Sequence, residues 1–324
     1  METVDRGSLR PQFPAMKTIS IVTPCYNEEG NIPELIRRVR EVMAQLPAYG
    51  YEHIFIDNAS TDQTLPVLRQ FAAEDRRIKV IVNARNFGHI RSPYHALLQA
   101  KGDAVISLVA DLQDPPDLIL DFVREWEAGH KVVVGIKSRS RESWWMYRLR
   151  GLYYRMIRRF ADVELLEHFT GFGLYDRQIM DVLRGLREPY PYFRGLISDV
   201  GYDIKRVEYT QPGRMHGRTK NDFLTLFDMA LLGFTSYSKI PLRLATLVGF
   251  VTAGLSLGVG MGYLIAKLLF WNTFTAGVAP VMIGIFFLGS VQLIFMGIVG
   301  EYVGAVFTYV QNRPLVIEKE RINF

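Results

Sequence analysis

The chain has 324 residues and a formal charge of +5, with 38 basic and 33 acidic side chains. That length exceeds what one small domain needs and leaves room for a sizeable core with an appended region. The one cysteine, Cys25, excludes an intramolecular disulfide and favours a reducing compartment. We expect no nucleic-acid partner, because the basic residues lie close to apolar segments, which favours a membrane surface or phosphate groups.

Residues 1–15 are polar and lack the apolar stretch of a signal peptide, so we expect a flexible amino-terminal tail. Two units with one pattern follow, each an apolar strand, then a loop of carboxylates and hydroxyls, then a helical pattern. Strand, loop and helix are expected at 18–22, 23–29 and 32–43, and again at 53–56, 57–62 and 64–73. Successive strands with polar carboxyl ends are typical of nucleotide-binding α/β domains.

The most informative segment is 106–116, which reads Ile-Ser-Leu-Val-Ala-Asp-Leu-Gln-Asp-Pro-Pro. An apolar run that ends at Val109 predicts a short buried strand, and the two prolines end regular structure. The oxygens of Asp111, Gln113 and Asp114 then follow the carboxyl end of that strand, where they can hold a hard divalent cation. From these residues alone, a polar turn between a strand and a helix explains the segment equally well.

Four motifs, in the order PxYNEE, D-[DN]-x-S-x-D, RNFG and ADLQDPP, resemble those of glycosyltransferase family 2. More narrowly, the chain resembles the membrane-bound branch that moves a sugar from a nucleotide onto a polyprenyl phosphate, to which bactoprenol glucosyltransferases and dolichol-phosphate mannose synthases belong. The resemblance extends from about Met16 to Pro314. It implies an α/β fold with a GT-A nucleotide-binding domain and a mixed, mostly parallel sheet, followed by interfacial helices and two transmembrane helices.

The resemblance implies that Asp111 and Gln113 hold Mg²⁺ or Mn²⁺, a Lewis acid for the leaving diphosphate. Many relatives have another Asp two positions before Asp111, where this chain has Val109, so the diphosphate and water would complete the coordination of the ion. Asp114 is a weaker candidate ligand, because it can instead cap the helix that begins near Pro115.

By the same resemblance, six residues line the base, ribose, sugar and diphosphate of the donor: Pro24, Tyr26, Glu28, Asp57, Asn86 and Gly88. Two departures stand out. Asn58 occupies the place of a second Asp in many relatives, and Gly171 replaces an Asp that relatives often have. Either Asp199 supplies the missing carboxylate, as a further catalytic residue, or the sugar differs from glucose and mannose.

The acceptor would be a lipid phosphate, which is mostly dianionic at neutral pH and needs cations more than a general base. Arg214 and Lys220, in a loop that matches the family pattern R-x-x-G-x-[ST]-K, form one candidate set for catalysis and acceptor binding. The other set follows an apolar strand and consists of Lys137, Arg139 and Arg141. A solvated basic loop is the alternative for either set.

The carboxyl third of the chain is apolar. Residues 244–270 and 281–300 are each long enough to cross a bilayer, which takes roughly 20 residues. Residues 222–238 have a broad apolar face and lead into the first span, as an interfacial helix does. Residues 144–160 mix tryptophans and tyrosines with arginines, which fits either the headgroup region or an ordinary helix with its aromatic side chains in the core.

Basic residues flank the two spans and the connector 271–277 carries no charge, so the positive-inside rule places both termini in the cytoplasm. We therefore expect a multi-pass protein of the cytoplasmic, or inner, membrane with a cytoplasmic catalytic domain. The expected divisions are a tail at 1–15, the catalytic domain at 16–221, an interfacial amphipathic helix at 222–240, a transmembrane hairpin at 241–311 and a cytoplasmic tail at 312–324.

The leading hypothesis is a metal-dependent, inverting hexosyltransferase that moves a sugar from a nucleoside diphosphate sugar, UDP-linked or else GDP-mannose, to polyprenyl phosphate. Its expected partners are the donor, the acceptor and the lipid bilayer, and a homo-oligomer is compatible with the sequence. A processive polysaccharide synthase is disfavoured, because the chain lacks a QxxRW motif and further spans. The non-enzymatic alternative is a membrane scaffold built on an inactive transferase domain, motivated by Val109 and Gly171.

Overall fold

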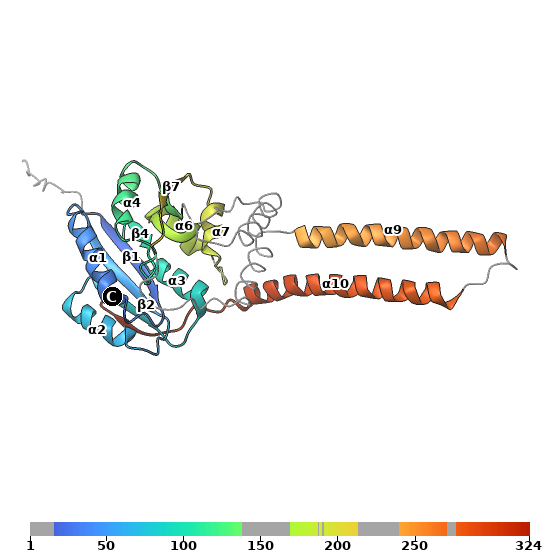
Figure 1. Cartoon of the computed structure of the whole chain (residues 1–324), viewed down its shortest axis with the longest axis horizontal. Helices are drawn as coiled ribbons and strands as arrows, with labels where there is room; N and C mark the ends of the chain where they lie inside the picture. The colour runs from blue at the N-terminus through green and yellow to red at the C-terminus, as the bar shows by residue number, and fades with distance from the viewer. Residues whose placement is uncertain (1–15, 138–168, 187, 190, 213–239, 271–276) are drawn as a thin grey trace, which may run out of the picture. The chain divides into compact units, whose positions relative to one another are not determined.

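The computed structural model describes residues 16–137, 169–186, 188–189, 191–212, 240–270 and 277–324 (Figure 1). Contacts divide the chain into two compact units. The first comprises 1–141, 166–219 and 314–324, and the second comprises 142–165 and 220–313. Segment 144–160, with its two open interpretations, and the expected interfacial helix at 222–240, apart from Ile240, lie outside the described residues.

An eight-stranded mixed sheet, in the order β7-β5-β6-β4-β1-β2-β3-β8, organises the first unit. β6 and β8 run antiparallel to their neighbours, and the other strands share one direction, so their carboxyl ends meet at one edge. This confirms the predicted mixed, mostly parallel sheet. The strands are β1 (Thr18–Cys25), β2 (Gly50–Asp57), β3 (Ile78–Asn83), β4 (Ala104–Ser107), β5 (Val132–Lys137), β6 (Phe169–Asp176), β7 (Ile204–Tyr209) and β8 (Glu318–Ile322).

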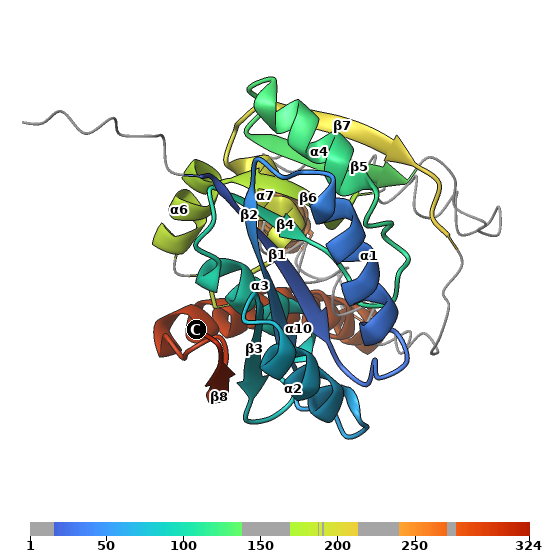
Figure 2. The ribbon, with the colours of Figure 1, turned by 90° about the vertical axis from the view of Figure 1, so that its left-hand side faces the viewer.

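Helices cover both faces of the sheet (Figure 2). α1, α2 and α4 pack on one face through side chains such as Leu35 and Phe122, and α3, α6 and α7 pack on the other through side chains such as Tyr94 and Ile179. α1 follows the expected pattern, because its buried residues recur every three or four positions. The helices are α1 (Ile32–Ala44), α2 (Thr64–Glu74), α3 (Gly88–Gln99), α4 (Leu118–Glu127), α6 (Arg177–Gly185) and α7 (Phe193–Asp199).

The end of the chain belongs to the sheet. β8 pairs antiparallel with β3, and Asn323 Nδ2 donates hydrogen bonds to the carbonyl oxygens of Ala72 (2.6 Å) and Ile78 (2.9 Å). Glu318 Oε1 lies 2.6 Å from His95 Nε2 of α3. Residues 318–322 of the expected tail at 312–324 therefore form an edge strand, and the cytoplasmic location of that tail stays a prediction. The sequence of this strand, Glu-Lys-Glu-Arg-Ile, lacks the apolar alternation that would predict a strand. Such a charged sequence can still form a strand here, because charged side chains are tolerated on an edge strand.

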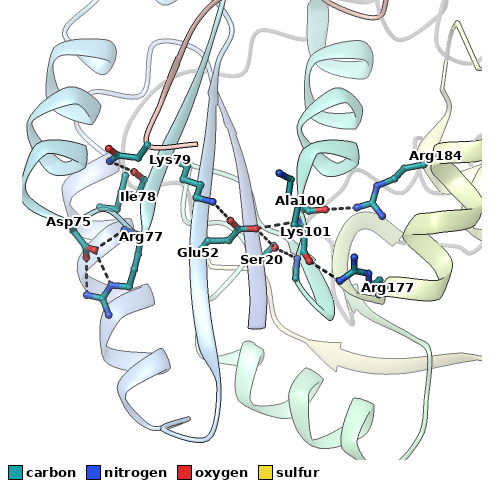
Figure 3. Close-up of polar contacts among 12 residues, drawn as sticks. Ser20, Glu52, Asp75, Arg77, Ile78, Lys79, Ala100, Lys101, Arg177 and Arg184 are labelled. Atoms are coloured by element: carbon teal, nitrogen blue, oxygen red, sulfur yellow. Dashed lines mark hydrogen bonds and ion pairs between the residues drawn. The ribbon is translucent and has the colours of Figure 1, made fainter. Parts of the chain in front are cut away.

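A buried polar cluster ties together the amino-terminal halves of β1, β2 and β3 (Figure 3). Glu52 accepts hydrogen bonds from Ser20 Oγ (2.5 Å), Lys79 Nζ (2.6 Å) and Lys101 N (3.3 Å). Burial raises the pKa of Glu52, but the hydrogen bonds from Lys79, Ser20 and Lys101 and the charge of Lys79 together hold that pKa below its usual value. Ser20 Oγ also accepts from Gly102 N (2.8 Å), at the turn into β4.

The second unit contains two long helices, α9 (Ile240–Leu269) and α10 (Val278–Gln311). Each includes a stretch long and apolar enough to cross a membrane, Ala245–Leu269 and Phe287–Gln311. Two apolar helices were expected here, and both are present. The second is longer than predicted: its 34 residues rise about 51 Å, against about 30 Å for a hydrocarbon core.

The packing around Gly102 predicts a stability defect. A Cβ at this position would lie 2.7 Å from both Ser20 Oγ and Thr18 O, so Gly102→Ala should destabilise the first unit by about 1–3 kcal/mol. Gly185→Ala is the matched control, because a Cβ on this last residue of α6 meets nothing within 4 Å. Thermal unfolding of the full-length protein measures both, and equal melting temperatures would contradict the predicted clash.

Candidate active site

The carboxyl ends of β4, β1, β2 and β3 lie side by side in that order. Because neighbouring strands are about 4.8 Å apart, only three strand spacings separate the loop after β4 from the loop after β3. The structure therefore brings the predicted donor and metal residues to one edge of the sheet, in that order of strands. They are Asp111 and Gln113 after β4, Pro24, Tyr26 and Glu28 at the end of β1, Asp57 at the end of β2, and Asn86 and Gly88 after β3.

The loops after β1 and β2 hold each other through hydroxyl and amide groups. Asn27 N donates to Ser60 Oγ (2.9 Å), and Thr61 N donates to Asn27 Oδ1 (2.8 Å). Glu28 N donates to Thr64 Oγ1 (2.8 Å). Many of the polar side chains that marked these loops in the sequence thus shape the loops themselves.

Three residues on this edge have a left-handed backbone although they are not glycine. Asn27 has a φ of 57°, Ala59 a φ of 59° and Leu112 a φ of 60°. Leu112 lies in the sequence between the predicted ligands Asp111 and Gln113, and its side chain is buried in the core. The backbone N–H of Gln113 donates a hydrogen bond to Asp111 Oδ1 (3.2 Å). Such conformations cost free energy and persist where the surroundings enforce them, as they do at functional sites.

Two ionisable groups are buried where β1 and β2 end. Asp57 is 1% exposed, and burial raises its pKa although Ser60 N donates to its carboxylate. Burial and the charge of Asp57 raise the pKa of the Cys25 thiol well above its usual value, and that thiol donates to Ile56 O (3.3 Å). Cys25 is therefore a protonated, structural residue.

Asp114 is buried, with 2% of its surface exposed, and accepts a hydrogen bond from Tyr209 Oη (2.6 Å) at the end of β7. Burial raises the pKa of Asp114 to about 6, although the Tyr209 bond and the charge of Lys137 lower it. Lys137 ends β5 in register with Tyr209. The helix after this loop, α4, begins at Leu118 with Asp117 at its N-cap position, so the alternative role of Asp114 as the cap of that helix does not apply.

Three residues near this edge were not predicted as part of the site: Tyr209, Arg194 and His89. The charge of Arg194, on α7, lowers the pKa of Asp114, and it also lowers the pKa of His89, for which burial is the larger cause. Arg194 is thus a cation whose charge acts on both Asp114 and His89. The only sequence signal for Tyr209 is its place at the carboxyl end of a strand.

Gly171 and Asp199 do not form an obvious replacement pair. Gly171 has a φ of +100°, so an Asp there would be strained, and a Cβ would face Phe193 at the start of α7. Asp199 is exposed at the other end of that helix, six residues or about 9 Å further along its axis. A catalytic role for Asp199 stays a prediction. Arg139, Arg141, Arg214 and Lys220 lie outside the described residues.

Among the described residues, no group of three or more His, Cys, Asp or Glu side chains could hold a metal ion. Asp111, which is 8% exposed, and Gln113 offer one carboxylate and one amide oxygen. Oxygen donors suit a hard divalent cation. This donor set fits a cation that also binds oxygens of a diphosphate, and it does not fit a cation held by protein carboxylates alone.

Comparison with known proteins identifies the class. Residues 20–184 match the profile of glycosyl transferase family 2. The chain is 34% identical to the uncharacterized glycosyltransferase YkcC of Bacillus subtilis, over 92% of each chain. It is 34% identical to the SfII prophage-derived bactoprenol glucosyl transferase of Shigella flexneri, over 93% of this chain and 97% of that one. The protein therefore belongs to glycosyltransferase family 2.

Among solved structures, mannosyl-3-phosphoglycerate synthase from Rubrobacter xylanophilus aligns with a TM-score of 0.45 at 20% identity, covering 66% of this chain and 70% of that one. A likeness of this size carries no argument about the substrate or the metal.

The raised pKa of the buried Asp114 carboxyl should make the stability of the protein depend on pH in the absence of divalent cations. Its folded-state pKa of about 6 exceeds an unfolded value of about 4, so the folded state binds this proton more tightly and the contribution to stability grows as pH falls from 7. Asp114→Asn removes that contribution. The difference in unfolding free energy between the variant and the wild type should change by about 1 kcal/mol between pH 7 and pH 5, in favour of the wild type at pH 5.

Denaturant titrations in EDTA at both pH values measure this difference. His53 acts in the opposite sense, because burial lowers its pKa to about 3 and its contribution is lost as pH falls below about 6.5. Both proteins contain His53, so its contribution cancels in the comparison. A difference that does not vary with pH would show that Asp114 is not the buried acid described above.

Proposed function

We propose that this glycosyltransferase moves a sugar from a nucleoside diphosphate sugar to a polyprenyl phosphate at the cytoplasmic face of the membrane, with inversion at the sugar. A UDP-sugar is the favoured donor and GDP-mannose the second candidate. The observation that carries the proposal is the shared carboxyl edge of the sheet, where the Asp111 loop lies beside the loops after β1, β2 and β3. The same chain contains two apolar helices long enough to cross a membrane. The similarity to a bactoprenol glucosyl transferase supports the lipid acceptor.

The loops after β1 and β2 would bind the nucleoside. Tyr26, Glu28 and Asp57 stand at the adjoining ends of these strands, and the hydrogen bonds between the loops keep them in place. The loop after β3, with Asn86 and Gly88, would bind the diphosphate or the sugar, because it lies one strand further along the same edge.

Asp111 and Gln113 would hold Mg²⁺ or Mn²⁺, which supplies Lewis-acid stabilisation of the leaving diphosphate. On the same edge, Lys137 and Arg194 act on Asp114, and these cations would attract an anionic phosphate. A phosphate monoester is mostly dianionic at neutral pH, so it can attack the sugar without a general base. Arg139, Arg141, Arg214 and Lys220 remain predicted contacts of that phosphate, on sequence grounds.

The two apolar helices would cross the inner membrane as a hairpin, with the catalytic unit and both termini in the cytoplasm. The charge distribution around them supports this orientation. A processive polysaccharide synthase fits less well, because the described residues contain two candidate spans and the sequence has no QxxRW motif.

Substitution at Asp111 tests the reaction. With vesicles that contain undecaprenyl phosphate, Mn²⁺ and a panel of UDP-sugars and GDP-mannose, wild-type protein should yield a lipid-phosphate sugar detectable by mass spectrometry. Asp111→Asn should lower the rate by a factor on the order of 10² to 10³, the cost typical of losing stabilisation of developing charge. The matched control is Asp117→Asn, which alters an exposed carboxylate six residues further on.

Near-normal turnover of Asp111→Asn would contradict the metal assignment. A wild-type protein that binds UDP or GDP but transfers no sugar from any of these donors to the lipid phosphate would contradict the proposed acceptor.

The orientation in the membrane is tested by labelling. A cysteine introduced as Thr273→Cys, in the connector between the helices, should react with an impermeant thiol reagent added to intact cells. Cys25, which is 3% exposed, is replaced by alanine in the same protein so that the signal has one source. Labelling only after lysis would show that the connector faces the cytoplasm and overturn the orientation.

A further inference from the structure

The loop after β3, residues 85–88, rests on three buried polar side chains. Asn58 (6% exposed) follows β2, Asn83 (2%) ends β3 and Ser92 (1%) lies in α3. Asn83 Nδ2 donates to both Asn58 Oδ1 (3.0 Å) and Ser92 Oγ (2.9 Å). The exposed loop therefore depends on a buried network that reaches it from two strands and a helix.

Asn58 uses both ends of its carboxamide. Its Oδ1 accepts from Phe87 N (2.9 Å) as well as from Asn83, and its Nδ2 donates to Asn86 Oδ1 (2.9 Å) and Gly88 O (3.2 Å). The backbone partners fix this orientation, because the Phe87 N–H can only donate and the Gly88 carbonyl can only accept.

Asn86 is oriented in turn. Its Oδ1 accepts from Asn58 Nδ2 and from Gly88 N (2.7 Å), so the oxygen faces the loop and the amide N–H₂ group is the end that can meet a ligand. Asn86 is exposed at the carboxyl edge of the sheet, and Gly88 adopts a φ of +83° to close the turn. N–H donors at this place suit the anionic oxygens of a diphosphate or the hydroxyls of a sugar.

We propose that Asn58 is a positioning residue for donor recognition, whose carboxamide sets the polarity of Asn86 and the shape of the 85–88 loop. The inference rests on the proposed function for the identity of the ligand, a nucleoside diphosphate sugar. An Asp in place of Asn58 would accept hydrogen bonds but, when ionised, would donate none. In this chain, such an Asp would set a carboxylate oxygen against Asn86 Oδ1 and Gly88 O.

The proposal is tested by comparing Asn58→Asp with a matched control, Asn323→Asp. Both substitutions replace an amide that donates two hydrogen bonds, since Asn323 Nδ2 donates to Ala72 O and Ile78 O at the opposite end of β3. Both should lower the melting temperature. Only Asn58→Asp should weaken binding of the sugar nucleotide, by a factor of about 10 to 100, as expected for one or two lost hydrogen bonds.

Calorimetry on the full-length protein with UDP-glucose, GDP-mannose and the matching nucleoside monophosphates provides the readout. The affinity of Asn58→Asp for the monophosphate should stay within about twofold of wild type, because the 85–88 loop would contact the sugar and the phosphate next to it, which the monophosphate lacks. A loss that is equal for the monophosphate and the sugar nucleotide, or equal in Asn58→Asp and Asn323→Asp, would overturn the proposal.

A double-mutant cycle separates positioning from general destabilisation. If Asn58 acts through Asn86, then Asn58→Asp should weaken sugar-nucleotide binding far less in an Asn86→Ala background than in the wild type. Additive effects would overturn the proposal. Should Asn58→Asp fail to fold, Asn58→Ala replaces it. Alanine removes the two bonds that Nδ2 donates, together with the two that Oδ1 accepts, without adding a charge. Unchanged donor affinity in that variant would also overturn the proposal.

These binding measurements do not depend on the acceptor. If the wild type binds a sugar nucleotide but glycosylates no lipid phosphate, the proposed function fails while the comparison at Asn58 still decides this inference.

Discussion

The candidate site depends on the parallel pairing of β1 with β2 on one side and β4 on the other. Cys25 pairs with Asp57, so β1 and β2 end at the same level. Val22 pairs with Ser107, so β4 ends three residues earlier, and the segment from Leu108 leads on to the Asp111 loop. β1 is covered on both faces, and Ile19 and Ile21 are fully buried, as expected for a central parallel strand. Because this register fixes the strands side by side, the loops that follow them begin next to one another.

The carboxyl edge of the sheet contains buried ionisable groups. Burial raises the pKa of Cys25, Asp57 and Asp114, and a buried carboxylate costs free energy unless it is paired. Lys137 and Arg194 offset part of this cost at Asp114. The carboxyl edge of the sheet thus carries the cost of burying ionisable groups, and at Asp114 nearby basic side chains offset that cost only in part.

The sheet is completed late in the chain. β3 has β8 as its outer neighbour, and β8 follows both apolar helices in the sequence. Until residues 318–322 are synthesised, β3 is an open edge with unpaired backbone groups, which is a risk for misassembly. The salt bridge between Arg69 and Glu320 (2.5 Å) and the clamp by Asn323 then close this edge. The catalytic unit is consequently made from segments on both sides of the helical pair.

Local patterns in the sequence determined the elements and much of the edge. Apolar runs with polar carboxyl ends predicted β1, β2 and the Asp111 loop, because burial and turn chemistry act over a few neighbouring residues. Helical spacing predicted α1 and α2, and apolar length predicted α9 and α10. The shared edge followed from one rule, that parallel strands present their carboxyl ends together.

Only the tertiary structure decided which polar groups meet. Tyr209 lies 95 positions from Asp114, and Asn83 lies 25 positions from Asn58, so no local pattern marks either hydrogen bond. By their sequence alone, the charged residues of β8 indicate a solvated tail, and only pairing with the backbone of β3 makes them a strand. The sequence thus determined what each segment can form and bury, and the tertiary structure decided the distant pairings, because these depend on register and packing that no segment contains by itself.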